Sequence, residues 1–118
     1  MAVEIKSEGY QDIKDYIEAN WIWVELRDST GTVWGRISTS DTRVAWTHSS
    51  GDQVLEVTIS LRGDDDDITL PQEFAESVLY KVETDGDEFS ANTFSATTLE
   101  ENDDELTIKH QVQVPEVE

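Results

Sequence analysis

The stretch QVLEVTISL, residues 53–61, decides the fold class of this chain. Apolar and polar residues alternate along it, and its apolar side consists of Leu55, Val57, Ile59 and Leu61. Alternation over this length is typical of a β-strand that buries one face in a core. The sequence therefore predicts a half-buried strand, and the segments on both sides of it repeat the pattern.

The segment before this strand predicts its hairpin partner. RVAWTH, residues 43–48, is joined to it by the turn-forming sequence SSGD. Pairing across this turn sets Trp46 opposite Leu55 and Val44 opposite Val57. We therefore expect the indole of Trp46 in the core.

A second hairpin is predicted earlier in the chain. Residues 21–27 and 32–38 flank the turn-rich sequence DSTG. The register that gathers the aliphatic residues of both strands on one side sets Trp23 opposite Arg36 on the other side. Cross-strand pairs of this kind stabilise sheets, and an exposed cation–π pair contributes about 0.5–1 kcal/mol.

The rest of the chain predicts one helix and further short strands. The helix spans about residues 8–19, with an apolar stripe formed by Ile13, Tyr16 and Ile17. After a loop, the expected elements are a strand at 68–70, a helical turn at 72–77, and strands at 77–82, 93–99 and 106–114. Seven to eight antiparallel strands between residues 21 and 114 predict a single β-sandwich or barrel domain, residues 1–118, with one short N-terminal helix.

The charge of the chain is extreme for a small domain. Eight Lys and Arg stand against 27 Asp and Glu, so the net charge is −19, whereas roughly 2–8 in magnitude suits a small soluble domain. Strong brine screens such self-repulsion, because the Debye length at about 1 M salt is near 3 Å. Since the acids are spread among aromatic-rich strands, the composition resembles that of folded haloarchaeal proteins. It offers no basic face for a phosphate backbone, so nucleic-acid binding is not expected.

No motif predicts catalysis. The chain has no cysteine, which excludes disulfides and thiol chemistry. No serine lies in a nucleophile-elbow pattern, and no Gly-rich phosphate loop is present. His48 at a hairpin end and His110 in the last alternating strand are interpreted as structural. We therefore expect a non-enzyme without a cofactor, and no run approaches the about 20 apolar residues of a membrane span.

One acidic loop is a candidate cation site. Its adjacent carboxylates belong to Asp64, Asp65, Asp66 and Asp67. Hard cations prefer oxygen ligands, so Ca²⁺, Mg²⁺ or Na⁺ would be held loosely by this loop. The spaced acidic pattern of a dedicated calcium loop is absent, and a solvated loop surrounded by counterions is the competing interpretation.

Three tryptophans and one arginine form the candidate interface. Trp21, Trp23 and Trp34 are predicted on the side of their hairpin opposite to its aliphatic residues, together with Arg36. Three fates remain open for them: burial under a second layer, a sugar-binding platform, or a subunit interface, in which Trp and Arg are enriched. We prefer the interface to the platform, because an acidic module gains affinity for a like-charged neighbour mainly through apolar contacts.

The second half of the chain carries a further pattern, in residues 67–115. It contains a strand, a bend at Pro71, an aliphatic-aromatic strand (VLY, 78–80), a Gly-containing turn, the segment FSAT (94–97), and DELTI before a closing strand. This order resembles the small β-sandwich virion proteins of tailed viruses, in which a short chain repeats many times in a head or tail. Together with the composition, the chain resembles a virion structural protein of a haloarchaeal tailed virus.

The resemblance implies a non-enzymatic structural protein that assembles with copies of itself and with other virion proteins as a homo-oligomer. It brings no catalytic residues. A capsid decoration or vertex protein is favoured over a tail component, because a compact sandwich suits an addition to a surface. The expected location is the virion, assembled in a high-salt cytoplasm. The alternative is a halophilic carbohydrate- or surface-binding β-sandwich module that uses the tryptophans as a stacking platform.

Overall fold

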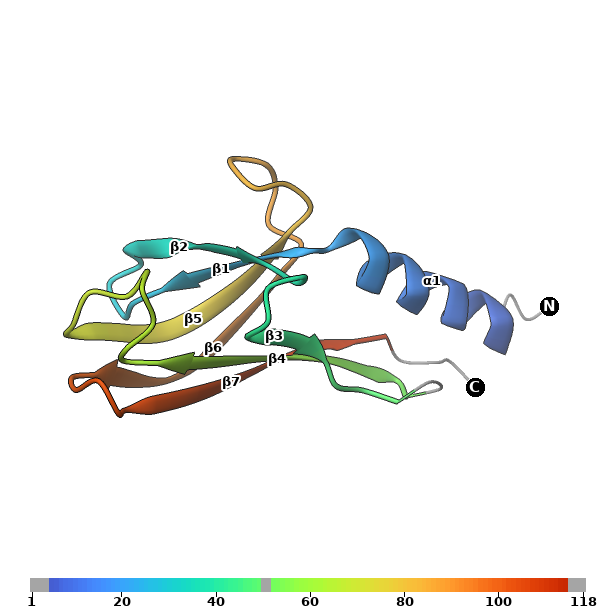
Figure 1. Cartoon of the computed structure of the whole chain (residues 1–118). Helices are drawn as coiled ribbons and strands as arrows, with labels where there is room; N and C mark the ends of the chain where they lie inside the picture. The colour runs from blue at the N-terminus through green and yellow to red at the C-terminus, as the bar shows by residue number, and fades with distance from the viewer. Residues whose placement is uncertain (1–4, 50–51, 115–118) are drawn as a thin grey trace.

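The protein folds as two β-sheets and one helix in a computed structural model that describes residues 5–49 and 52–114. The elements in chain order are α1 (Ser7–Asn20), β1 (Trp23–Arg27), β2 (Val33–Ser38), β3 (Val44–Trp46), β4 (Val54–Arg62), β5 (Gln72–Tyr80), β6 (Ser90–Leu99) and β7 (Glu105–Gln113). The sheets are antiparallel, with strand orders β2-β1-β5-β6 and β3-β4-β7. They face each other without closing into a barrel, so the predicted β-sandwich with an N-terminal helix is confirmed (Figure 1).

The strand that decided the fold class lies at the centre of its sheet. Leu55, Val57, Ile59 and Leu61 on β4 are fully buried, as predicted. β7 pairs with β4 along its whole length without a register shift. This pairing places the side chain of His110 in the core.

The segment after the acidic loop differs from the prediction. The expected strand at 68–70 is wrong, because these residues lie in a loop. The expected helical turn at 72–77 is also wrong, because these residues belong to β5, which runs from Gln72 to Tyr80. β5 lies between β1 and β6 and is covered on both faces near its end, where Ser77, Val78, Leu79 and Tyr80 are all buried. A strand that is buried on both sides shows no alternation for a sequence pattern to detect.

Both hairpins have the predicted partners in a register shifted by two residues. Trp46 lies opposite Val57 and not Leu55. Trp23 lies opposite Ser38, so the predicted pair with Arg36 is wrong. In the first hairpin an irregularity between Leu26 and Arg27 shifts the pairing again.

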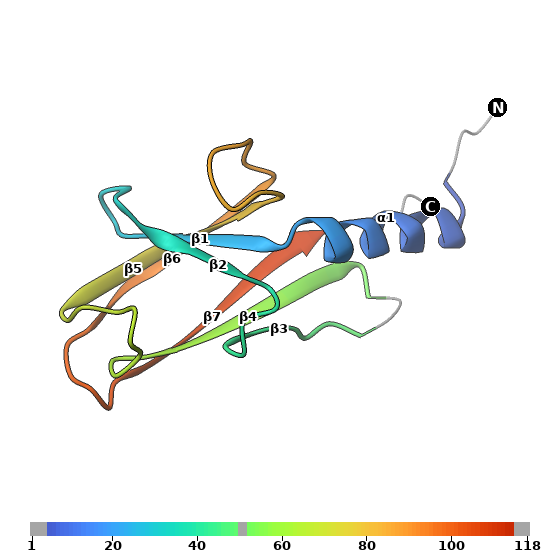
Figure 2. The ribbon, with the colours of Figure 1, turned by 45° about the horizontal axis from the view of Figure 1, so that its top comes forward.

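Helix α1 extends beyond one end of the sandwich and makes the molecule elongated, with extents of 58 × 27 × 24 Å (Figures 1 and 2). Its buried residues are Tyr10, Lys14 and Ile17. The predicted stripe is therefore right only for Ile17, since Ile13 is 39% exposed and Tyr16 is 50% exposed. Lys14 is buried because its Nζ donates to the carbonyl of Asp52 at 2.9 Å.

Candidate functional site

The three candidate interface tryptophans do not share one surface. Trp34 packs against the core, where its ring meets Phe74 edge-on with 5.6 Å between centroids. Trp21 also packs against the core and stacks on Phe89 at 5.4 Å. Trp23 is half-buried on the outer face of the four-stranded sheet, which is the face turned away from the other sheet. Their role as an interface stays a prediction.

Arg36, the fourth predicted interface residue, belongs to a charged cluster on this outer face. Its guanidinium lies 3.4 Å from the centre of the Tyr80 ring. Its Nε donates to Glu25 at 3.0 Å, and its Nη1 donates to the carbonyls of Val82 and Asp85 at 2.9 and 2.7 Å. The guanidinium therefore covers a tyrosine and holds the segment that follows β5.

Arg27 completes the cluster from the same strand as Glu25. Its Nε donates to Glu25 at 2.6 Å and its Nη2 donates to the hydroxyl of Tyr80 at 2.8 Å. It also forms ion pairs with Glu76 at 3.4 Å and with Glu88 at 3.2 Å. Sequence reasoning missed this cluster because its members come from β1, β2, β5 and the loop 81–89, and only the register brings them together.

Glu25 is the carboxylate around which the cluster is organised, and it is 5% exposed. Burial raises its pKa, but hydrogen bonds from Arg36 and Arg27 outweigh this effect and hold the pKa below its ordinary value. Burial and the Glu25 charge raise the pKa of the Tyr80 phenol. The carboxyl is therefore ionised and the phenol protonated, which suits a clamp on the loop 81–89 rather than an acid or a nucleophile.

Three of the four aspartates of the predicted cation site are engaged by arginines. Arg43 forms ion pairs with Asp65 at 3.3 Å and with Asp67 at 2.8 Å, and Arg62 pairs with Asp64 at 3.1 Å. Within residues 5–49 and 52–114, no three of the four predicted aspartates converge on one point. The loop is thus held by charge pairs to the turn before β3 and to the end of β4, and loose binding of Ca²⁺, Mg²⁺ or Na⁺ stays a prediction.

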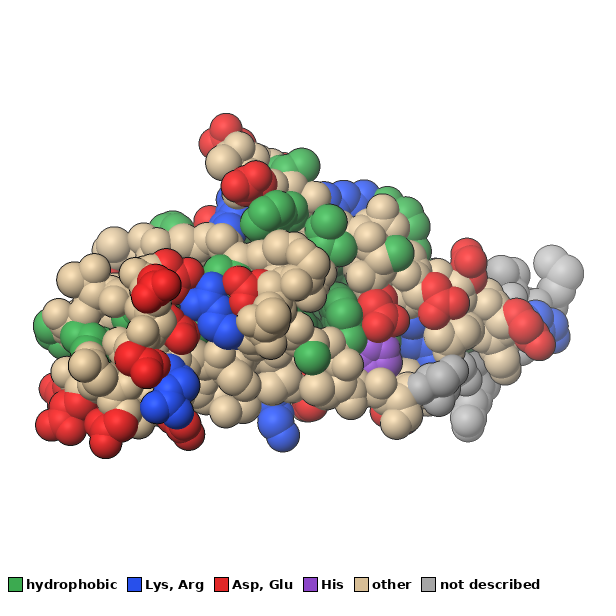
Figure 3. Space-filling view, viewed as in Figure 1, with side chains coloured by type: hydrophobic (Ala, Val, Ile, Leu, Met, Phe, Trp, Pro, Cys, Tyr) green, Lys and Arg blue, Asp and Glu red, His purple; other side chains and the backbone are tan. Residues whose placement is uncertain are grey.

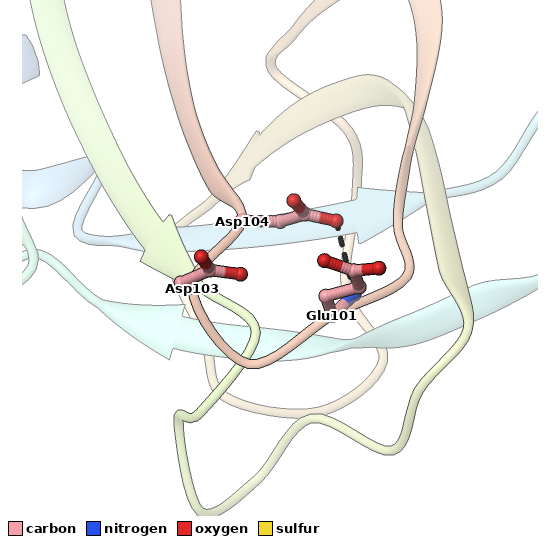
Figure 4. A group of neighbouring side chains, drawn as sticks. All are labelled: Glu101, Asp103 and Asp104. Carbon is pink, nitrogen blue, oxygen red and sulfur yellow. Dashed lines mark hydrogen bonds between the residues drawn. The ribbon is translucent and has the colours of Figure 1, made fainter.

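Another group of carboxylates does converge, in the turn between β6 and β7. Carboxylate oxygens of Glu101, Asp103 and Asp104 lie within 4.8 Å of one another (Figure 4). Asp104 accepts hydrogen bonds from the backbone N–H groups of Glu100 and Glu101 at 2.9 and 3.0 Å, and these bonds lower its pKa. The Asp104 side chain therefore stabilises the turn, and the group adds to an acidic end of the molecule that also contains the 64–67 loop (Figure 3).

The two histidines occupy structural positions. His110 is fully buried, and its Nδ1 and Nε2 lie 2.7 and 2.9 Å from the hydroxyls of Ser77 and Ser90 on the opposite sheet. Burial lowers its pKa to about 4, against a smaller opposing effect of the hydrogen bond with Ser77. His48 accepts a backbone hydrogen bond from Glu56 at 3.2 Å. His110 thus joins the two sheets through neutral hydrogen bonds.

The described surface also exposes several large apolar side chains, which are Ile5, Ile13, Tyr16, Val33, Val82 and Phe89. Apart from Val33, they belong to α1, to the two residues before it or to the loop 81–89. Figure 3 shows hydrophobic side chains between this projecting loop and the helix. Sequence reasoning had placed Ile13 and Tyr16 in the core-facing stripe, and their exposure is what makes this surface apolar.

Comparison of the chain with protein-family models, with curated proteins and with solved structures found no match. Among the described residues, no helix has the length and apolar character needed to cross a membrane.

Proposed function

We propose that this chain is a non-enzymatic virion structural protein of a haloarchaeal tailed virus, present as repeated copies that associate symmetrically. A capsid decoration or vertex position is favoured over a tail position. The observation that carries the proposal is the exposed apolar surface on α1 and the loop 81–89, in a molecule with a net charge of −19. Its partners are copies of itself and other virion proteins.

Charge and salt explain why such a surface suits association. Two copies of a strongly acidic protein repel each other in dilute buffer. At about 1 M salt, the Debye length of about 3 Å removes most of this repulsion. Apolar contacts do not depend on charge, so aromatic and aliphatic side chains hold copies together in brine, where ion pairs are weakened.

The resemblance to small virion proteins adds independent support. Residues 67–115, which carry it, contain β5, β6 and β7. β5 and β6 belong to one sheet and β7 to the other, so this segment contributes to both layers of the sandwich. A short two-layer chain of this kind suits repeated placement on a particle.

The carbohydrate-binding alternative depends on accessible indole faces. Trp21 stacks on Phe89 with an angle of 29° between the rings, which occupies one face of the indole. Trp34 packs against the core beside Phe74. Of the three predicted platform residues, this leaves Trp23, and one half-buried indole is a poor platform for a sugar.

Light scattering of the full chain in about 2 M NaCl, where surface charges are screened, tests the proposal over a series of concentrations. We expect the mass to rise with concentration towards a fixed multiple of one chain. A mass of one chain at every concentration, together with calorimetric binding of soluble glycans, would support the carbohydrate-binding module instead.

A further inference from the structure

Helix α1 carries two parallel stripes, and the sandwich covers one of them. The covered stripe consists of Tyr10, Lys14 and Ile17. The second stripe starts one residue earlier, at Gly9, and continues through Ile13 and Tyr16 with the same spacing of four and three residues. A surface helix normally turns its apolar stripe towards its own core. The second stripe is therefore apolar surface that no described element of the fold covers.

Neighbouring residues extend the second stripe at both ends. Ile5 lies against Gly9, since a Cβ added at Gly9 would be 2.7 Å from Cγ2 of Ile5. At the other end, Lys81 donates to the hydroxyl of Tyr16 at 2.6 Å and lies 5.1 Å from the centre of the Phe89 ring. We define the α1 strip as Ile5, Ile13, Tyr16 and Phe89, whose exposed fractions range from 39 to 50%.

The acidic residues of the helix lie beside or away from the α1 strip. At about 100° per residue, Asp12 borders the strip, Glu8 and Asp15 lie farther round the same flank, and Glu18 lies on the side opposite to the strip. A second helix can therefore approach along the strip without meeting a carboxylate at its centre. An anionic membrane surface is a poor partner, because the acidic flank would face the lipid headgroups.

We infer that the α1 strip binds the α1 strip of a second copy, with the two helices antiparallel about a two-fold axis. In such an isologous contact, the middle of the surface meets its own symmetry partner, and Ile13 is the middle of the strip. The antiparallel direction also brings Lys81, beside the end of one helix, towards Glu8 in the first turn of the other. The inference rests on the proposed function, because it names the partner for that association.

The size of the helix sets the strength of this contact. Fourteen residues span about 21 Å at 1.5 Å per residue, so the pair buries less surface than the about 1,600 Å² of a standard interface. Two copies in solution should therefore associate weakly. On a particle, where other contacts hold many copies close together, the same strip gains from their high effective concentration.

Disulfide cross-linking tests the position of the two-fold axis. The chain has no cysteine, so Ile13→Cys introduces a single thiol at the middle of the strip. Val33→Cys is the matched control, because Val33 is 49% exposed on β2, away from the strip. Under mild oxidation in about 2 M NaCl, where surface charges are screened, we expect cross-linked pairs with Ile13→Cys at least tenfold faster than with Val33→Cys. Equal rates would overturn the inference.

Light scattering of substituted full-length chains separates this inference from the proposed function. Ile13→Gln and Tyr16→Gln change exposed side chains and should leave the tryptophan fluorescence of the folded protein unchanged. We expect each to raise the dissociation constant at least tenfold, while Val33→Gln leaves it unchanged. If the natural chain associates and all three variants associate equally well, the inference is wrong and the proposed function stands. If the natural chain stays a single copy at every concentration, both are wrong.

Discussion

The effect of His110 protonation on the free energy of unfolding tests whether this buried, neutral imidazole helps to hold the two sheets together. Its imidazole lies in the core and contacts the hydroxyls of Ser77 at 2.7 Å and Ser90 at 2.9 Å. Burial lowers its pKa from 6.5 to about 4, partly offset by the hydrogen bond with Ser77. The ring is therefore neutral in the folded protein at neutral pH, and charging it there is opposed by the loss of hydration.

The size of the effect follows from linkage between protonation and folding. In the unfolded chain the imidazole has its ordinary pKa of about 6.5. The folded state binds the proton less tightly, so the contribution of His110 to stability is fully present above pH 6.5 and is lost as the pH falls through about 4. At 1.36 kcal/mol for each tenfold difference in proton affinity, the loss between pH 8 and pH 4 is about 3 kcal/mol.

Urea unfolding of the natural chain and of His110→Gln, followed by tryptophan fluorescence in about 2 M NaCl to screen surface charge, measures this loss. All other ionisable groups, including the 27 Asp and Glu, are the same in both proteins, so their effects cancel in the difference between the two free energies of unfolding. We expect the advantage of the natural chain at pH 8 to shrink by about 3 kcal/mol at pH 4. The same advantage at both pH values would show that His110 is solvated in the folded state, and would refute the reasoning.

Two further substitutions test how loops are fixed to the sandwich. Glu25→Gln should lower the free energy of unfolding by about 3 kcal/mol, because Arg27 and Arg36 lose their shared carboxylate. Urea unfolding measures this loss. A loss below about 0.5 kcal/mol would contradict the proposal that the Glu25 cluster clamps the loop 81–89. Gly63→Ala should lower the free energy of unfolding by about 1–3 kcal/mol, because the added Cβ would lie 1.9 Å from the carbonyl oxygen of Glu101. An unchanged urea midpoint would mean that the loop at Gly63 and the turn at Glu101 are not in contact.

Strands with one buried face were predictable, and their registers were not. In β4 and β7, alternation follows burial directly, so their positions were predicted to within one residue at each end. Both hairpin registers were wrong by two residues, because a shift of two leaves every side chain on the same face. The pattern that locates a strand therefore cannot choose between such registers. In the first hairpin an irregularity beside Arg27 shifts the pairing further.

The predicted helix was right in place and wrong in the residues it buries. Hydrophobicity selected Ile13 and Tyr16, whereas the sandwich covers Tyr10 and Lys14. A lysine enters the buried stripe because its ammonium group reaches the carbonyl of Asp52, and its aliphatic stem packs like an apolar side chain. The hydrogen-bond partner comes from a loop 38 residues away, so no local pattern could indicate it.

The arginines bear on the proposed association between copies. Arg27 and Arg36 bind Glu25 and the loop 81–89, while Arg43 and Arg62 bind three aspartates of the loop 64–67. These are half of the eight cations in the chain. Each is engaged within its own molecule, which leaves few cations to pair with an acid on a neighbour.

This distribution of charge decides which contacts between copies can be strong. With its arginines engaged internally, the protein presents a neighbour with a surface dominated by carboxylates, and ion pairs between copies are few. Raising the salt concentration weakens the repulsion between carboxylates and removes little attraction. In the proposed association, contact through the uncharged α1 strip therefore meets the least electrostatic repulsion and buries the most apolar surface. Association through it should therefore strengthen as salt is added, whereas association through ion pairs would weaken.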